Sequence, residues 1–189
     1  RELGKYRKLV DSEYFSGYGY TADQVLAEND IDFTPIESFG VKQGEDTLGN
    51  LIADSYKYAI AKTDGNDEQE ISGVDVTVVP SGVRGSLLHG DVTVADAFNI
   101  LSLGYGSDGS PGYPLVRVYL TGRELKDAAE VDASISDFMG VARLYMSGLE
   151  YSWNSNRLIL NRAVDVKLND GRDVKELEND RMYSVAADL

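Results

Sequence analysis

Glu45-Asp-Thr-Leu-Gly-Asn-Leu-Ile-Ala-Asp54 is the stretch from which the fold of this 189-residue chain is best worked out. Thr47 is suited to cap a helix, and apolar side chains recur after it at helical spacing as far as Ile60. The acids Glu45 and Asp46 complement the positive end of the helix dipole. The stretch therefore predicts an amphipathic helix with Thr47 as its cap.

Signals of strands and further helices follow this helix. Residues 74–79 are compact and β-branched, which predicts a buried strand. Thr121-Gly-Arg-Glu124 matches a capping box and predicts a helix that runs to about Val131. Other expected elements are a helix at 93–98, strands at 115–120, 164–168 and 183–189, a turn at 169–171, and a hairpin in which 149–153 and 158–160 flank 154–156. This mixture indicates an α+β domain.

The two ends of the chain differ in character. Residues 1–39 are tyrosine-rich and weakly periodic, which predicts an N-terminal arm or linker. Residues 40–189 contain no internal repeat and no linker, so they predict one domain. The chain starts at Arg1 without a signal-peptide pattern and stops within an expected strand. We therefore expect a fragment of a longer protein, truncated at its C-terminal end.

Composition excludes several functions. The chain has 18 basic and 32 acidic residues, a formal charge of −14 that repels a nucleic-acid backbone. It contains no cysteine, which excludes disulfides, thiol catalysis and zinc sites built on sulfur. No stretch approaches the roughly 20 apolar residues of a membrane span. We expect neither nucleic-acid binding nor contact of this chain with a membrane.

Residues for catalysis by the chain itself are scarce. Its single histidine, His89, stands beside Gly90 and cannot build a two-metal site, so we expect a loop histidine with a local hydrogen bond. The acidic stretch 64–70 lacks the sixth-position glycine of a calcium loop. Ser81 lacks the preceding glycine of a nucleophile elbow. The sequence predicts no catalytic residue, no metal ligand and no cofactor in this chain.

A small anion is a better-supported ligand. Ser81-Gly82-Val83-Arg84 follows the buried strand, where the chain turns and exposes backbone N–H groups. Gly82 allows close approach to the backbone, and Arg84 supplies a forked cation for phosphate or carboxylate. The glycine- and proline-rich stretch 102–114 is long enough to be a functional loop.

The order of these motifs resembles the C-terminal domain of the 5'-nucleotidase family. The matching stretches are 45–54, 81–84, 90–93 with Asp96, 101–104, 120–125, 147–151 and 156–157. The resemblance implies an α+β fold of mixed sheets covered by helices, similar to the family's α/β/β/α sandwich. It also implies the substrate-binding domain of a bacterial phosphoester hydrolase in nucleotide catabolism.

The resemblance implies a binding role for particular positions. Arg84, with Ser81 and Gly82, occupies the family's loop that holds the substrate phosphate or a carboxylate-like group. Lys42 falls near a second family arginine and keeps the charge without the bidentate fork.

The nucleobase end departs from the family pattern. The family's aromatic base-stacking position corresponds to Leu103-Gly104, which supplies no ring, although Tyr105 can substitute from the next position. Val79 stands where the family has asparagine. The resemblance therefore implies a substrate pocket made of Arg84, Gly82, Ser81, Lys42, Leu103, Gly104 and Tyr105, with an altered base site.

The resemblance also implies partners. In the family, a separate N-terminal metallophosphatase domain holds a divalent metal pair and performs the chemistry. We expect this chain alone to be inactive, to bind a nucleotide or another small phosphoester, and to work with such a domain of the same protein. The implied location is extracellular, at the cell surface or in the periplasm.

Two alternatives remain at this point. The differences at Leu103, Tyr105 and Val79 suit a non-catalytic ligand-binding or structural module of a bacterial surface protein. Tyr105, Tyr113 and Trp153 suit a carbohydrate-binding domain if they are exposed.

Overall fold

The computed structural model describes residues 2–39, 43–63, 73–80, 83–102, 104, 109 and 112–188. The chain forms two compact units, 1–36 with 83–102 and 37–82 with 103–189. The helices are α1 (Glu2–Glu13), α2 (Thr47–Thr63), α3 (Val94–Ile100) and α4 (Gly122–Ile135), with 3-10 turns at Phe15–Tyr18, Ile36–Ser38 and Gly140–Ala142. The strands are β1 (Val25–Asn29), β2 (Val76–Pro80), β3 (Gly90–Thr93), β4 (Leu115–Thr121), β5 (Leu144–Ser147), β6 (Leu149–Trp153), β7 (Ala163–Asn169), β8 (Val174–Glu176) and β9 (Met182–Asp188). None of the helices in these ranges is long and apolar enough to cross a bilayer.

The smaller unit joins two separate segments of the chain. Strand β1 pairs antiparallel with β3, and α3 follows β3 directly. Thr93 caps α3 and forms a capping box with Asp96, which confirms the predicted helix start. Phe15, Ala22 and Val94 form its small core. The segment 1–39, expected to be an arm, thus contains a helix and a strand that pairs with residues beyond it.

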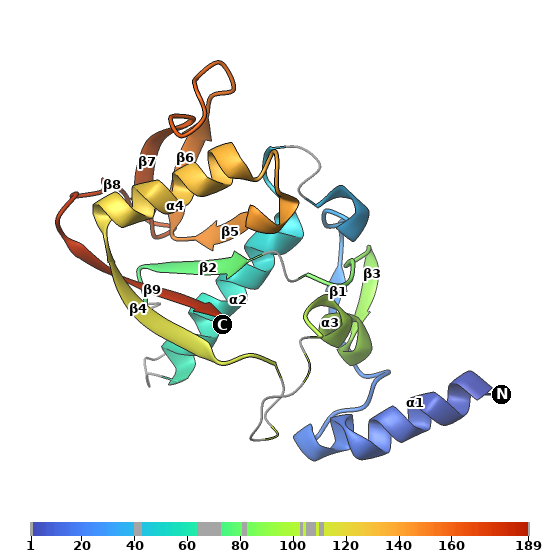
Figure 1. Ribbon diagram of the computed structural model, residues 1–189. Helices are drawn as coiled ribbons and strands as arrows, with labels where there is room; N and C mark the ends of the chain where they lie inside the picture. Colours follow the sequence, from blue (N-terminus) through green and yellow to red (C-terminus); the bar gives the residue numbers. More distant parts are fainter. Residues whose placement is uncertain are drawn as a thin grey trace. The chain divides into compact units, whose positions relative to one another are not determined.

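The larger unit contains two sheets (Figure 1). The first has the strand order β4-β9-β2-β5, in which β2 and β9 run parallel and the other neighbours antiparallel. The second, β6-β7-β8, is antiparallel. Helices and mixed sheets together confirm the predicted α+β class.

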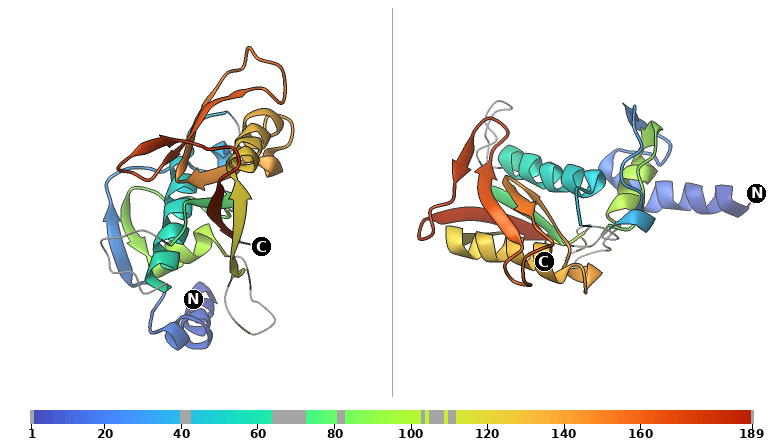
Figure 2. Two further views of the ribbon diagram at one scale, coloured as in Figure 1. Left: turned by 90° about the vertical axis from the view of Figure 1, so that its left-hand side faces the viewer. Right: turned by 90° about the horizontal axis from the view of Figure 1, so that it is seen from above.

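Strand β2 is buried on both faces, because its side chains alternate between two layers. Val76 belongs to the apolar core that also contains Leu125 of α4 and Val166 of β7. The next residue, Thr77, is fully buried and its hydroxyl donates to the carbonyl of Ala53 in α2, at 2.7 Å. Figure 2 shows α2 and α4 on opposite sides of the first sheet.

Helix α2 lies very close to β5. A Cβ atom on Gly49 would overlap the ring of Tyr145, so only glycine allows this approach. The N–H of Asn50 donates to the carbonyl of Asp46 at 3.1 Å. That bond makes Asp46 the cap and Thr47 the first helical residue, so the cap lies one position earlier than the sequence indicates.

Helix α4 begins as predicted and ends later. Thr121 and Glu124 form the expected capping box. The helix continues past Val131 to Ile135, and its last turn buries Asp132, Ala133 and Ser134. The extension follows from these buried contacts, which the local sequence does not reveal.

The predicted hairpin is wrong in its second strand. Strand β6 pairs with β7, and residues 158–160 form no strand. The N–H groups of Leu160 and Arg162 donate instead to α4 side chains, to Ser134 Oγ at 2.9 Å and to Glu130 Oε1 at 2.7 Å. Because these two N–H groups bond to side chains of α4, residues 158–162 lie against that helix and not in a strand, and β7 begins after them.

Gly148 is expected to be the most demanding turn position. It has a φ of +88°, and an added Cβ would overlap the carbonyl oxygen of Asp75. Gly171 has a φ of +84° and no atom within 4 Å of its Cβ position. Gly171→Ala should therefore cost about 1 kcal/mol, whereas Gly148→Ala should cost about 3 kcal/mol or more, because overpacking adds to backbone strain. Urea unfolding of both variants checks the difference, and equal losses would contradict it.

The hydrogen bonds of Glu130 to the β6–β7 connection make the stability of the chain depend on pH. Burial raises the pKa of this carboxyl, but hydrogen bonds from Ser134, Arg162 and Ala163 outweigh burial and hold the pKa below its usual value. Its contribution to stability is therefore complete above its unfolded pKa of about 4.3 and is lost as the pH falls through the lower folded pKa. Glu130→Gln should be less stable than the unmodified chain at pH 7, and the difference should shrink below about pH 4. Thermal unfolding from pH 7 to 3 measures it; a difference that grows with acid contradicts the prediction.

Candidate functional site

Two of the predicted binding residues lie within the described ranges. Arg84, in the smaller unit, is exposed, and its N–H donates to the carbonyl of Ile100 at 2.8 Å. Gly104, in the larger unit, is exposed with a φ of +83°, and its carbonyl accepts from the N–H of Gly112 at 2.8 Å. Five others, Lys42, Ser81, Gly82, Leu103 and Tyr105, lie outside the described residues. The anion site therefore stays a prediction.

His89 and the acidic stretch 64–70 are the residues that the sequence offers as candidate metal ligands. His89 is exposed in a loop, and its backbone N–H donates to Asp32 Oδ1 at 2.8 Å. The acidic stretch 64–70 lies outside the described residues. Across the described ranges, no three His, Cys, Asp or Glu side chains are grouped as a metal ion requires. The donor set in the described residues does not fit a metal pair.

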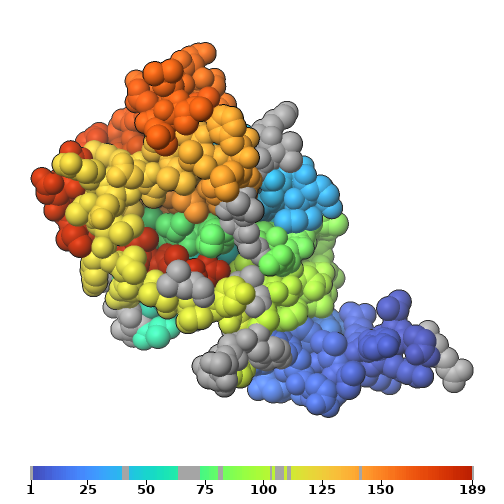
Figure 3. Space-filling view, in the orientation of Figure 1, coloured from blue at the N-terminus to red at the C-terminus, as the bar shows by residue number. Residues whose placement is uncertain are grey.

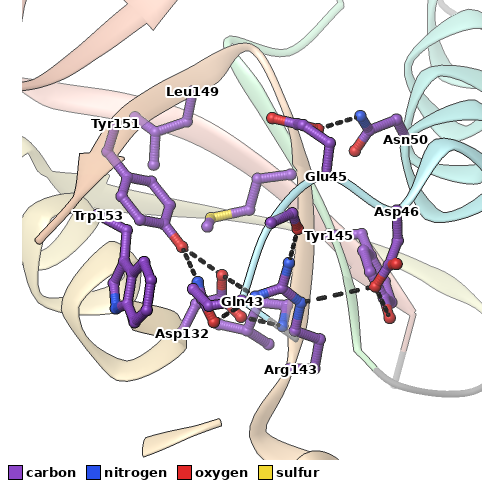
Figure 4. Close-up of a pocket in the computed structure, with 13 residues that line it drawn as sticks. Gln43, Glu45, Asp46, Asn50, Asp132, Arg143, Tyr145, Leu149, Tyr151 and Trp153 are labelled. Atoms are coloured by element: carbon purple, nitrogen blue, oxygen red, sulfur yellow. Dashed lines mark hydrogen bonds and ion pairs between the residues drawn. The ribbon is translucent and has the colours of Figure 1, made fainter. Parts of the chain in front are cut away.

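A cavity of about 220 Å³ lies in the larger unit (Figure 4). It lies where the segment before α2, the end of α4, and strands β5 and β6 meet. Its walls combine charged, amide and aromatic side chains. The lining residues are Gln43, Gly44, Glu45, Asp46, Asn50, Asp132, Arg143, Leu144, Tyr145, Met146, Leu149, Tyr151 and Trp153.

Arg143 is the central residue of this cavity and is only 5% exposed. One guanidinium nitrogen, Nη1, donates to Gln43 Oε1 at 2.7 Å and to Asp132 Oδ2 at 3.3 Å. The other, Nη2, donates to the carbonyl of Gly44. Nε stands 3.8 Å from Asp46 Oδ2 as an ion pair. One side chain, immediately before β5, thus connects the end of α4 with three residues of segment 43–46.

Asp132 orients this guanidinium from α4. It is 2% exposed and accepts from the backbone N–H of Leu144 at 2.9 Å through Oδ1. Its Oδ2 accepts from the hydroxyl of Tyr151, and that hydroxyl accepts from Gln43 Nε2 at 3.2 Å. Burial, and then the charge of Asp132, raise the pKa of Tyr151 well above its usual value. The hydroxyl therefore remains a donor throughout the neutral range.

Asp46 closes the network on the other side of Arg143. Tyr145 donates from its hydroxyl to Asp46 Oδ2 at 3.0 Å. Burial, followed by the charge of Asp46, raises the pKa of Tyr145 above its usual value. The Arg143 guanidinium also lies 5.7 Å from the centre of the Tyr145 ring, within cation–π range.

The chemistry of this cavity suits structure rather than proton transfer. Asp46 and Asp132 outnumber Arg143, and Glu45 adds a further carboxylate, so the local field disfavours a phosphate. The polar groups bond one another, and both tyrosines stay protonated. The arrangement fixes segment 43–46 just before α2.

The sequence gives little sign of this network. Gln43 and Tyr151 are 108 residues apart, and the other partners lie in the segment before α2, in α4, and in or just before β5. The only local signal is a basic residue, Arg143, at the start of the apolar run Leu144-Tyr-Met146. A buried arginine of this kind requires carboxylate partners, but the sequence does not say which.

Removing Arg143 should destabilise the larger unit strongly. Arg143→Met leaves two buried carboxylates without their cation, which should cost about 3–5 kcal/mol. Arg123→Met is the control, because Arg123 forms an ion pair at 3.8 Å with Asp180 in which both side chains are largely exposed, 69% and 96%. The control should lose about 1 kcal/mol. Chemical unfolding of both variants measures the contrast, and similar losses would show that burial of the pair has no special weight.

Comparisons with known proteins identify the family and the fold. The chain is 28% identical over 148 residues to the trifunctional nucleotide phosphoesterase protein YfkN of Bacillus subtilis, and 35% identical over 132 residues to a 5'-nucleotidase-related protein of Glossina morsitans morsitans. These matches include 77% and 66% of this chain. They span only 9% and 21% of the two relatives.

Solved structures show the same fold. The 5'-nucleotidase precursor of Thermus thermophilus superimposes with a TM-score of 0.72 at 24% identity, over 98% of this chain and 32% of that one. The NAD nucleotidase of Haemophilus influenzae gives 0.63 at 20% identity, over 98% and 32%. The family model for the 5'-nucleotidase C-terminal domain matches residues 25–188. Because that match includes most of both units, the chain belongs to the family of 5'-nucleotidase C-terminal domains.

Proposed function

We propose that this chain is the substrate-binding domain of a 5'-nucleotidase-like phosphoester hydrolase that acts in nucleotide catabolism. The observation that carries the proposal is the family match over residues 25–188. The name of the Bacillus subtilis relative, a nucleotide phosphoesterase, supports the substrate class. In this proposal a metallophosphatase domain of the same protein supplies a divalent metal pair and the hydrolytic step, outside the cell, at its surface or in the periplasm.

Arg84 is the residue we assign to the substrate anion. Its backbone is held to the last residue of α3 through the 2.8 Å bond to Ile100, while the residue stays exposed. A guanidinium in that position offers two parallel donors to a phosphate. In a chain of charge −14, such a local cation is needed to hold any anion.

One observation favours a second candidate, a non-catalytic ligand-binding or structural module. Val79 has no exposed surface and pairs with Tyr145 in the sheet, so it offers a ligand no polar group where the family has asparagine. The sequence of the parent protein discriminates between the two. A metallophosphatase domain with clusters of aspartate, asparagine and histidine favours the enzyme, and adhesion repeats favour the module.

The enzyme proposal is tested on the complete parent protein. It should be assayed with Mn²⁺ for phosphate release from nucleotides, cyclic nucleotides and nucleotide sugars. Release from at least one class is expected. No release from any of them, with bound metal confirmed, would overturn the proposal.

Arg84→Gln should weaken substrate binding in the parent protein. Loss of a charge-assisted, bidentate contact of about 1.5–3 kcal/mol should raise KM about 10- to 100-fold. Arg84→Lys should recover part of the loss, because it keeps the charge without the fork. Arg123→Gln is the control, an exposed arginine 3.8 Å from Asp180. Steady-state kinetics measures all three, and an unchanged KM for Arg84→Gln would remove Arg84 from the site.

A further inference from the structure

The connection between β6 and β7 carries an unusual run of exposed aliphatic side chains. Leu158 is 82% exposed, Ile159 49% and Leu160 65%. Figure 3 shows this part of the chain as the orange projection at the top of the view. Single exposed leucines are ordinary, but three aliphatic residues in succession at a projecting tip mark a surface that contacts something apolar. Residues 158–160 are called the apolar tip below.

The apolar tip is held firmly in its exposed position. The N–H of Asn161 donates to the carbonyl of Leu158 at 3.0 Å, which closes a turn. Leu160 has a φ of 64° there, a conformation that glycine or asparagine adopts far more readily than leucine. The bond from Leu160 N–H to Ser134 fixes the turn on α4. A strained leucine kept outward by such bonds indicates a functional constraint.

Residues at the base of this loop and at the end of α4 add further apolar surface. Arg162 pairs with Asp137 at 2.8 Å, which brings the base of the loop to the end of α4. The next two residues there, Phe138 and Met139, are 67% and 54% exposed. Trp153, at the other end of the loop, is 39% exposed, and its indole N–H donates to the carbonyl of Ala133 at 3.0 Å. Five large exposed apolar side chains therefore accompany a tryptophan in this region.

Charge also distinguishes this region. Residues 137–163 contain two acidic residues, Asp137, which pairs with Arg162, and Glu150, although the chain has 32 acids. Arg157, next to the apolar tip in sequence, is exposed, whereas Arg162 on its other side is paired with Asp137. An aliphatic tip with arginine and tryptophan at its base has the pattern of loops that enter a bilayer interface, where arginine reaches the phosphates and tryptophan lies at headgroup level.

We propose that the apolar tip inserts into the interfacial layer of a lipid bilayer. A protein groove is the less suitable occupant, because the three residues of the tip itself are aliphatic and leucine is under-represented among interface hot spots. A second copy is also less suitable, since two projecting tips bury far less than the roughly 800 Å² per partner of a stable contact. The proposal reverses the expectation from sequence of no membrane contact, and it is independent of the proposed hydrolase activity.

The test is co-sedimentation of the chain with sucrose-loaded phosphatidylcholine vesicles. Trp153 is the only tryptophan, so its emission reports on the base of the loop directly. We expect sedimentation with the vesicles, a blue shift of the emission, and little change with added salt, because apolar burial drives insertion. The double variant Leu158→Ser, Leu160→Asn should lower the vesicle partition coefficient at least about tenfold.

The design separates insertion from misfolding. Asparagine tolerates the backbone conformation of residue 160 better than leucine, so the double variant should unfold at no lower temperature. Leu51→Gln is the control, an aliphatic residue 42% exposed on α2, and should sediment like the unmodified chain. The proposal is overturned if the unmodified chain does not sediment with the vesicles, or if the double variant sediments with them as well as the unmodified chain does. Self-association that the double variant abolishes, without vesicle binding, would overturn it in favour of a contact between copies.

Discussion

Strand β2 meets different chemistry on its two faces, and the larger unit is arranged around that difference. Val76 points into an apolar core shared with α4 and β7, while Thr77 satisfies its buried hydroxyl on the carbonyl of Ala53 in α2. A slip of one residue along β2 would exchange these faces and bury an unpaired hydroxyl in the apolar core. The register of β2 therefore determines which face of the sheet α2 covers and which face α4 covers. Because segment 43–46 leads directly into α2, its position depends on the same register.

The Arg143 network extends this constraint to the start of α2. It bonds three different residues of segment 43–46 at once, so that segment cannot move independently of β5 and α4. Buried ion pairs are weak contributors to stability against an apolar replacement, but losing one partner is severe. Such a network is better suited to specifying one arrangement of distant segments than to strengthening the unit.

Local signals explain which elements the sequence predicts well. The capping boxes at Thr93 and Thr121 and the β-branched run of β2 are each complete within a few residues, and all three appear in the structure. Residues 158–160 fail as a strand because their N–H groups find acceptors on α4, which no local pattern encodes. The sequence does not predict the cavity for the same reason, because the side chains that bond one another in its walls come together only in the folded chain. Family motifs indicate Arg84, whereas the arrangement of its loop with Lys42 and Leu103 stays a prediction.

The position of β9 has a consequence for how the chain folds. In its sheet β9 lies between β4 and β2, although it follows every other strand of that sheet in the sequence. Val76 pairs with Val185, so the parallel contact joins residues more than a hundred positions apart, and closing such a loop is entropically slow. Strand β9 lies between β2 and β4 and pairs with both. During synthesis on the ribosome, β2 and β4 have unpaired edges until β9 has been made. Binding of a chaperone or a neighbouring domain during that period would protect these edges from aggregation.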